Sequence, residues 1–159
     1  MAITMRAKDT ISSKLAECYV TIGNNRYNFM TMKNFEAKFE KQKTEVAILG
    51  QSGKGNKSTG WKGTWTANMH YNTSIMRQLA VEFKNTGADM YFEIQISNED
   101  PSSSAGRQTM TFLDCNFDSL ILAKFDATSD EPLDEDMSGT FEDFEMPESF
   151  NLLDGMLTN

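Results

Sequence analysis

The most regular pattern of apolar and polar positions in the chain lies between residues 60 and 71. On one side, every second position is apolar or small: Trp61, Gly63, Trp65, Ala67, Met69 and Tyr71. The positions between them, from Lys62 to His70, are polar. A period of two with one apolar side is typical of a strand that is buried on one face. We therefore expect an amphipathic strand here.

Similar patterns recur along the rest of the chain. The other predicted strands are residues 14–22, 26–32, 34–40 with its continuation 44–49, 90–97, 107–118, 119–127 and 137–146. Gly23, Asn24 and Asn25 supply turn chemistry between the first two strands, because both residue types tolerate positive φ. The period changes phase near Leu113, where two apolar residues are adjacent. This change predicts a β-bulge or a strand that switches sheets.

Only residues 74–86 have a convincing helical period. Their apolar stripe consists of Ile75, Met76, Leu79, Ala80 and Phe83. Asn72, Thr73 and Ser74 are candidate N-caps, and Gly87 is placed to end the helix. The fold class that follows is mainly β: an antiparallel β-sandwich or barrel of seven or eight strands with one flanking α-helix. The length of 159 residues predicts a single domain.

Four segments outside this pattern are polar or terminal. Residues 1–13 read as an N-terminal arm that becomes ordered when something docks on it. Residues 50–60 are rich in glycine and lysine and predict an extended loop, while residues 129–136 predict an acidic turn. The C-terminal tail, residues 147–159, carries apolar residues at quasi-helical spacing after Pro147. It is either a docking peptide for a neighbour or a segment that folds back on its own domain.

Composition narrows the classes of function. A net charge of −8 argues against a protein that coats nucleic acid, although a negative wall suits DNA that must slide past without sticking. Cys18 and Cys115 each fall inside a predicted strand and are expected to be small core residues. One histidine, His70, without a cysteine cluster does not predict a zinc site. No apolar run is long enough for a signal peptide or a membrane-spanning segment, so we expect a soluble protein made in a cytosol.

The chain offers no convincing catalytic or cofactor site. A phosphate-binding loop needs a glycine-rich turn that ends in Gly-Lys-Ser/Thr and leads into a helix. Here Gly55 follows Lys54, Asn56 precedes Lys57, and a strand follows the segment, so we expect no nucleotide. The acidic pairs Asp134/Asp136 and Glu142/Asp143 lie in solvated stretches without a shaped cleft.

We therefore expect neither enzyme activity, nor a cofactor, nor a metal. The class of function that fits the sequence best is a structural or interaction protein. The second hypothesis is a secreted or carbohydrate-binding β-sandwich module, and the third is a small enzyme. Measurable glycan binding and exposed aromatic residues in a groove would favour the β-sandwich module.

Several stretches together resemble a known family in order and coverage. They are DTIS (9–12), KNFEA (33–37), KQKTEV (41–46), LG (49–50), TGWKGT (59–64), NFDS (116–119) and GTFEDFEMPE (139–148). The chain resembles the tail tube proteins of contractile-tailed phages, phage-like particles and R-type bacteriocins. The family pattern ends shortly after residues 139–148, so residues 151–159 lie beyond it.

The resemblance implies a virion structural protein. Subunits would form hexameric rings whose strands join into one β-barrel, and the rings would stack by self-assembly into a hollow tube. The tube would lie inside a contractile sheath, meet baseplate and tail terminator proteins, penetrate the target envelope and conduct DNA only in transit. The type VI secretion tube protein is similar in fold. The protein would be made in the bacterial cytoplasm and assembled in a phage tail or bacteriocin particle.

The resemblance also implies that loops and termini bridge subunits and rings. The residues expected at these interfaces are Gln51, Lys54, Asn56, Lys57, Thr59, Ile11, Phe150, Leu152 and Leu153. The lumen wall is expected on the strand faces that carry Glu36, Lys38, Glu40, Lys62, Thr64 and Thr66. The face with Trp61 and Trp65 would then meet the core.

Overall fold

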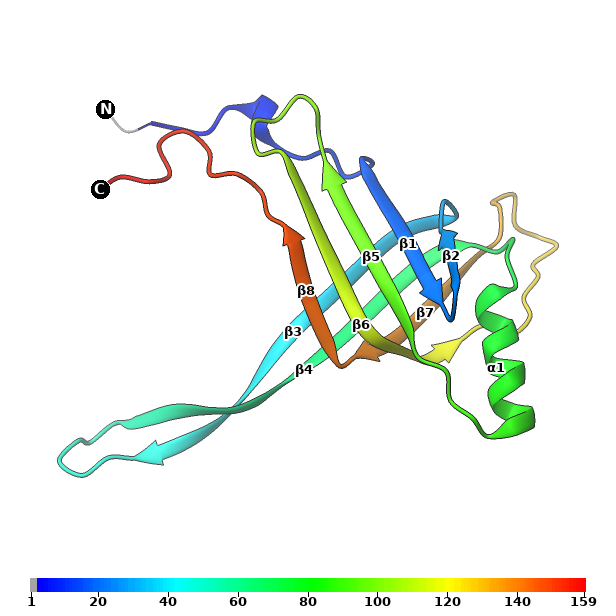
Figure 1. Ribbon diagram of the computed structural model, residues 1–159, viewed down its shortest axis with the longest axis horizontal. Helices are drawn as coiled ribbons and strands as arrows, with labels where there is room; N and C mark the ends of the chain where they lie inside the picture. The colour runs from blue at the N-terminus through cyan, green and yellow to red at the C-terminus, as the bar shows by residue number, and fades with distance from the viewer. Residues whose placement is uncertain (1–2) are drawn as a thin grey trace. The chain divides into compact units, whose positions relative to one another are not determined.

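The computed structural model describes residues 3–159 and is mainly antiparallel β with one α-helix (Figure 1). This confirms the predicted fold class. The elements are a 3-10 turn Ala7–Asp9, β1 Ala16–Ile22, β2 Asn25–Asn28, β3 Met32–Ala47, β4 Lys54–His70, α1 Ile75–Thr86, β5 Phe92–Glu99, β6 Arg107–Leu120, β7 Asp134–Phe141 and β8 Asp143–Glu148.

The described chain divides into two compact units. Unit 1 comprises the residues up to Met30, Tyr91–Cys115 and Asp143–Asn159. Unit 2 comprises Thr31–Met90 and Asn116–Glu142. Strand β6 is continuous and contributes its first part to unit 1 and its second part to unit 2. The single domain expected for the whole chain stays a prediction.

Unit 1 is an antiparallel sheet with one apolar face. Its strands lie in the order β2-β1-β5-β6, and β8 also pairs with β6. One row of paired residues crosses four strands: Val20, Ile94, Phe112 and Phe144. Val20, Ile94 and Phe112 are buried, as their alternation with polar neighbours requires. Cys18 and Cys115 are buried free thiols, which confirms their predicted place in the core.

Unit 2 combines the end of β6 with β7, β4, β3 and α1. Its buried apolar residues are Trp65, Ala67, Met69, Met76, Leu79, Met137 and Phe141. The helix begins and ends within one residue of the predicted range. Gly87 ends it in the left-handed conformation, φ +72°, and donates its N–H to Phe83 O at 2.8 Å. Thr73 accepts the Ile75 N–H at 3.5 Å.

The irregularity predicted near Leu113 is a β-bulge. Across β5 and β6, Phe92 pairs with Cys115 but Ile94 pairs with Phe112, so β6 carries one extra residue. Asp114 lies in this bulge and has φ +52°. Among the described residues it is the one non-glycine residue with a positive φ. The bulge lets the two parts of β6 take part in different units.

Two predicted strands were wrong. Residues 119–127 do not form a strand of their own, because β6 ends at Leu120 and the chain is irregular until β7. The strand predicted for residues 137–146 is two strands, β7 and β8, which are separated at Glu142. Phe141 and Phe144 are three positions apart, which does not fit a period of two. The two strands are separated between these residues.

The acidic turn ends earlier, and the tail begins differently, than the sequence predicts. Residues 134–136 belong to β7 and pair with β4, so the turn is shorter than expected. Pro147 lies inside β8 instead of ending the strand before it. Proline is tolerated there because β8 pairs on one side only, with β6, among the described strands.

Candidate functional site

The β3–β4 hairpin brings the six predicted lumen residues together on one face of unit 2. Glu36 pairs with Thr66, Lys38 with Thr64, and Glu40 with Lys62. Residues directly opposite each other in an antiparallel pair point to the same side of the sheet. The six side chains therefore form one polar surface, which we call the polar face. Lys38 Nζ lies 3.4 Å from Glu36 Oε1 along the same strand.

The polar face continues onto β7 as hydroxyl groups. Thr64 pairs with Thr140 and Thr66 pairs with Ser138. At one end the face is hollowed by an open cavity of about 530 Å³, whose lining includes Lys33, Asn68, Asp134 and Asp136. The Lys33 and Lys124 amines each lie 3.3 Å from Asp134, and they lower the pKa of its carboxyl. The face presents short neutral groups and equal numbers of positive and negative side chains, which is the chemistry of a solvated wall.

The opposite side of the hairpin is aromatic. Phe35 stacks on Trp65 with ring centroids 6.1 Å apart, and Phe39 stacks on Trp61 at 5.1 Å. The Trp65 indole N–H donates to Thr140 O at 3.2 Å. Trp65 is buried, as the alternation predicted for residues 60–71 requires. The expectation that Trp61 also meets the core is wrong, because Trp61 is 38% exposed and Phe39, on which it stacks, is 46% exposed.

The extended loop predicted for residues 50–60 is wrong over most of its length. Strand β4 already begins at Lys54, and the connection from β3 is residues 48–53, which include Gln51. Asn56 and Lys57 pair with Glu45 and Thr44 of β3. The composition suggested a loop, because glycine and polar residues have a low intrinsic preference for strands. Regular backbone pairing with the long strand β3 overrides that preference.

Beyond β7 the hairpin continues as a two-stranded arm, residues 41–60 (Figure 1). Strand β7 pairs with β4 only from Gly63 to His70. A bulge marks the base of the arm. Gln42 pairs with Gly60, Lys43 pairs with Ser58, and Thr59 between them donates its hydroxyl to Gln42 O at 3.2 Å.

The aromatic side of the hairpin becomes charged at the arm. The side of β3 that carries Phe35 and Phe39 continues into Lys41, Lys43 and Glu45. The other side, polar at Glu36, Lys38 and Glu40, stays polar at Gln42 and Thr44 and becomes apolar only at Val46 and Ile48, near the tip. Ile48 lies across Gly55, where an added Cβ would be 3.1 Å from Ile48 Cδ1. Leu49 at the tip is fully exposed. The arm cannot bury these apolar groups within two strands.

In unit 1 the N-terminal segment is tied to the loop between β5 and β6. The Asp9 carboxylate accepts the Ser104 N–H at 2.9 Å and the Ser104 hydroxyl at 2.8 Å. Ser103 donates its hydroxyl to Asp9 O at 2.8 Å. The bonds from Ser104 lower the pKa of Asp9. No sequence pattern predicted this contact, although the short polar run after Asp100 is typical of a loop whose amides are free to bind a carboxylate.

The C-terminal tail folds back on unit 1 at its beginning and has no helix. Asn151 donates its N–H to Ala105 O at 2.6 Å. Ile11, Phe150 and Leu153 are half-buried, whereas Leu152 is exposed. A cavity of about 590 Å³ lies between the tail and the N-terminal segment. Its lining includes the exposed side chains of Ile3 and Met5, and Met156 and Leu157 further along the tail are also exposed. A role for the tail as a docking peptide stays a prediction.

Unit 2 contains a buried ion pair that the sequence analysis placed in a solvated turn. Arg77 of α1 donates to Glu135 of β7 and to the backbone carbonyls of Thr73 and Ile121. Its guanidinium also lies 4.4 Å from the centroid of the Tyr71 ring. The sequence does indicate that Glu135 is buried, because Glu135 lies on the same side of the strand as the buried Met137 and Phe141.

Residues 3–159 contain no group of three or more histidine, cysteine, aspartate or glutamate side chains arranged to hold a metal ion. No helix within them is long and apolar enough to cross a bilayer.

Comparison with known sequences gives a consistent result. A family described as "Phage tail tube protein" matches residues 3–148. The phage-like element PBSX protein XkdM of Bacillus subtilis (strain 168) is 37% identical over 149 residues, which are 94% of this chain and 98% of XkdM. The uncharacterized protein YqbM of the same strain is 37% identical over 146 residues, 92% of this chain and 96% of its own length.

Solved structures share the fold. A chain in the cryo-EM structure of the anti-feeding prophage baseplate superposes with a TM-score of 0.66 and 12% identity, covering 91% of this chain and 97% of that chain. A chain of the PVC sheath-tube complex, an extracellular contractile injection system in the extended state, gives a TM-score of 0.62 and 14% identity, covering 90% and 94%.

Proposed function

We propose, from the premise that the chain belongs to the phage tail tube protein family, that its copies build the inner tube of a contractile injection tail as stacked hexameric rings. The observation that carries this proposal is the family match over residues 3–148, with two relatives at 37% identity along nearly their whole length. Members of such a family act by assembly and not by catalysis.

The polar face supports the proposal as the lumen wall. Its residues lie on one side of the hairpin, and Trp65 on the opposite side of the same strands is buried in the core. Charges of both signs and hydroxyl groups leave the face hydrated without a basic stripe that would hold nucleic acid. The chain as a whole is acidic, with a net charge of −8, so DNA in transit would be repelled and not retained.

The edges of the sheets and the arm supply the contacts between copies. Strand β3 ends the sheet order, so one side of its sixteen residues has no partner strand in the described chain. A long bare edge is an aggregation hazard unless a defined partner covers it. In the proposed ring that partner is a neighbouring copy. The arm, with Lys54, Asn56, Lys57 and Thr59, bridges copies, and so do the terminal segments around Ile11, Phe150, Leu152 and Leu153.

The remaining partners follow from the tube. Similar chains occur in structures of a baseplate, a tube-terminating cap and a sheath-tube complex of other injection systems. By analogy, this tube lies in a contractile sheath between a baseplate and a tail terminator. The protein is made in the bacterial cytoplasm and becomes part of the tail particle.

Electron microscopy tests the proposal. The purified protein at high concentration, viewed in negative stain, should form hollow tubes of uniform width or six-membered rings. A native particle that contains the protein should show it along the tail. A protein that stays monomeric at every concentration and is missing from the tails of native particles would contradict the proposal.

Shortening the arm tests its bridging role. Lys43 and Ser58 face each other, so an Asn-Gly turn that replaces residues 44–57 closes the hairpin with a two-residue loop. The shortened protein should keep its circular dichroism spectrum and cooperative unfolding but form no tubes. Normal tubes would show that the arm does not bridge copies.

A further inference from the structure

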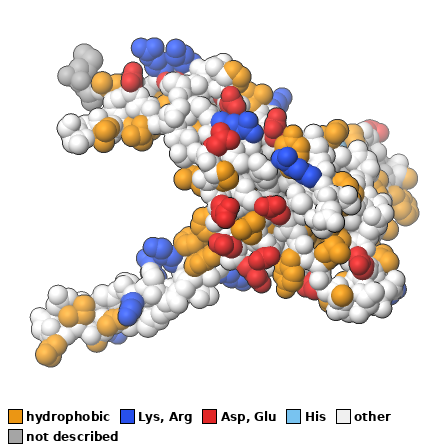
Figure 2. Space-filling model, in the orientation of Figure 1, with side chains coloured by type: hydrophobic (Ala, Val, Ile, Leu, Met, Phe, Trp, Pro, Cys, Tyr) orange, Lys and Arg blue, Asp and Glu red, His pale blue; other side chains and the backbone are white. Residues whose placement is uncertain are grey.

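The arm differs in charge from the rest of the chain. Residues 41–60 contain four lysines and one glutamate, a net charge of +3, so the remaining residues carry −11 of the total of −8. Figure 2 shows lysine side chains along the arm. A basic projection on an acidic protein is complementary to another copy of the same protein. The occupant that suits the arm is therefore a second copy of this chain.

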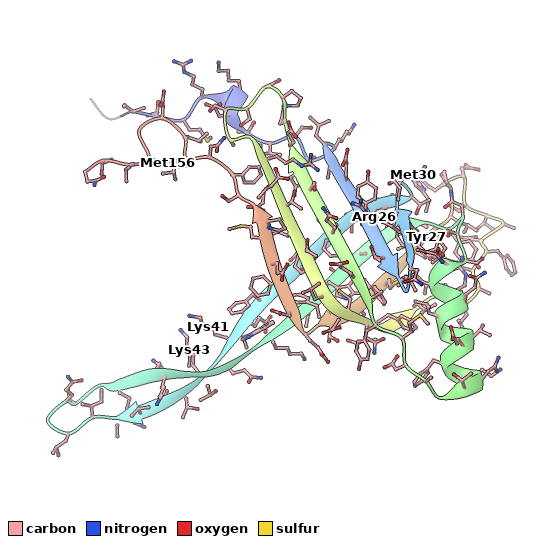
Figure 3. The ribbon with its side chains drawn as sticks, viewed as in Figure 1. Arg26, Tyr27, Met30, Lys41, Lys43 and Met156 are labelled. Atoms are coloured by element: carbon pink, nitrogen blue, oxygen red, sulfur yellow. The ribbon has the colours of Figure 1, made fainter. Side chains whose placement is uncertain are left out.

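Within the arm, Lys41 and Lys43 have no ion-pair partner in residues 3–159. Lys54, by contrast, lies 3.7 Å from Glu45. Lys41 and Lys43 are two positions apart on β3, so they project from the same side of the strand, and Figure 3 shows them together. Both are exposed. The two amines form a paired positive site where the arm leaves the rest of unit 2.

The matching acidic surface is the edge strand β8 in unit 1. Residues 142–148 contain four acidic residues and no basic one. Asp143 and Glu145 are exposed, lie two positions apart on one side of β8, and form no ion pair within the described chain. Met146, on the other side of the strand, is 54% exposed. Strand β8 pairs only with β6 among the described strands, so its outer backbone edge is open for a further strand.

We propose that the arm of one copy docks along the β8 edge of a second copy, with Lys41 and Lys43 against Asp143 and Glu145. With the two strands parallel, Lys41 lies opposite Asp143 and Lys43 opposite Glu145, so Thr44, on the other side of the arm, lies opposite Met146. Strand addition supplies main-chain hydrogen bonds, and the alternating side chains set the register and the choice of partner. This inference rests on the proposed function and names the surface that receives the arm.

Charge reversal tests the pairing between copies. The arm variant is Lys41→Glu/Lys43→Glu and the edge variant is Asp143→Lys/Glu145→Lys. Each alone places like charges together and should raise the critical concentration for tube assembly about tenfold, measured by sedimentation and negative stain. An equimolar mixture of the two variants should assemble near the wild-type concentration, because each arm then finds an edge of opposite charge on the other variant. Failure of the mixture would overturn the inference.

A matched control separates pairing from net charge. Combining Lys41→Glu/Lys43→Glu with Asp130→Lys/Glu131→Lys restores the net charge of −8, but the new lysines lie on the exposed segment before β7. This variant should remain defective, and recovery equal to that of the mixture would also overturn the inference. If the shortened arm forms normal tubes, the bridging function itself fails. If the shortened arm blocks assembly and the mixture does not recover, only the β8 assignment fails.

Discussion

The indole ring of Trp65 covers Gly139. A Cβ atom built on Gly139 would lie 2.7 Å from the Trp65 ring and 1.9 Å from the carbonyl oxygen of Asn116. Strand β7 therefore passes between β4 and β6 with no room for a side chain on that face. Because Gly139 has no side chain, the Trp65 ring and the backbone of β6 can both pack directly against β7.

We predict that Gly139→Ala destabilises the protein by about 3 kcal/mol or more, because a methyl group there collides with backbone that cannot move aside. The free energy of unfolding in urea measures this loss. Gly60→Ala is the matched control. Its added methyl group would meet only the flexible Gln42 side chain, at 3.3 Å, and should change stability by less than about 0.5 kcal/mol. Equal effects of the two variants would contradict the proposed packing role of Gly139.

The buried ion pair between α1 and β7 gives a second prediction. Glu135 is 4% exposed, so Arg77→Met would leave a buried carboxylate without its partner and should cost about 3–5 kcal/mol. The double variant Arg77→Met/Glu135→Met should lose less than the single one, because no charge remains buried. A double-mutant cycle of unfolding free energies measures the coupling. A double variant that is less stable than Arg77→Met would argue against charge burial as the cause.

The Asp9 contacts predict a pH dependence for the N-terminal segment. The pKa of Asp9 is lowered, so its bonds to Ser104 are fully present above the ordinary value of 3.8 and are lost as the pH falls through the lowered value. The Ser104 amide resonance, followed by NMR, should shift below that ordinary value. Asp9→Ala should abolish this titration and release the segment at neutral pH. Asp126→Ala, which removes a similar carboxylate that binds Thr128, should leave the Ser104 titration unchanged.

The outcome of the sequence analysis follows from the range of each interaction. Strand β4 and helix α1 were predictable because the apolar period and the helix-ending glycine can be recognised from residues close together in the sequence. The bulge near Leu113 was predictable because the apolar pattern changes phase there. The arm was misread as a loop because pairing between Lys54 and Ala47 is decided across the hairpin. Glu135 was misread because its partner lies 58 positions away, on α1. Asp9 and Ser104 were not connected for the same reason.

The two cysteines should be inert in the folded protein. Burial raises the pKa of the Cys18 and Cys115 thiols to about 12, so almost no thiolate forms at pH 8. A thiol reagent such as DTNB should therefore react with less than a tenth of an equivalent in native protein, and with two equivalents after unfolding in guanidinium. Rapid reaction in the native state would mean that the strand cores of unit 1 open far more readily than their burial indicates.

Because the native thiols are shielded, single introduced cysteines can test which face lines the tube. Thr66→Cys lies on the polar face, and Glu82→Cys lies on the exposed side of α1. In free subunits both should react with a large polyethylene glycol maleimide at similar rates. In assembled tubes the bulky reagent cannot enter a narrow lumen, so Thr66→Cys should become protected while Glu82→Cys stays reactive. A small maleimide should still reach Thr66→Cys through the water-filled channel. Equal labelling of both positions by the bulky reagent in intact tubes would place the polar face outside the lumen.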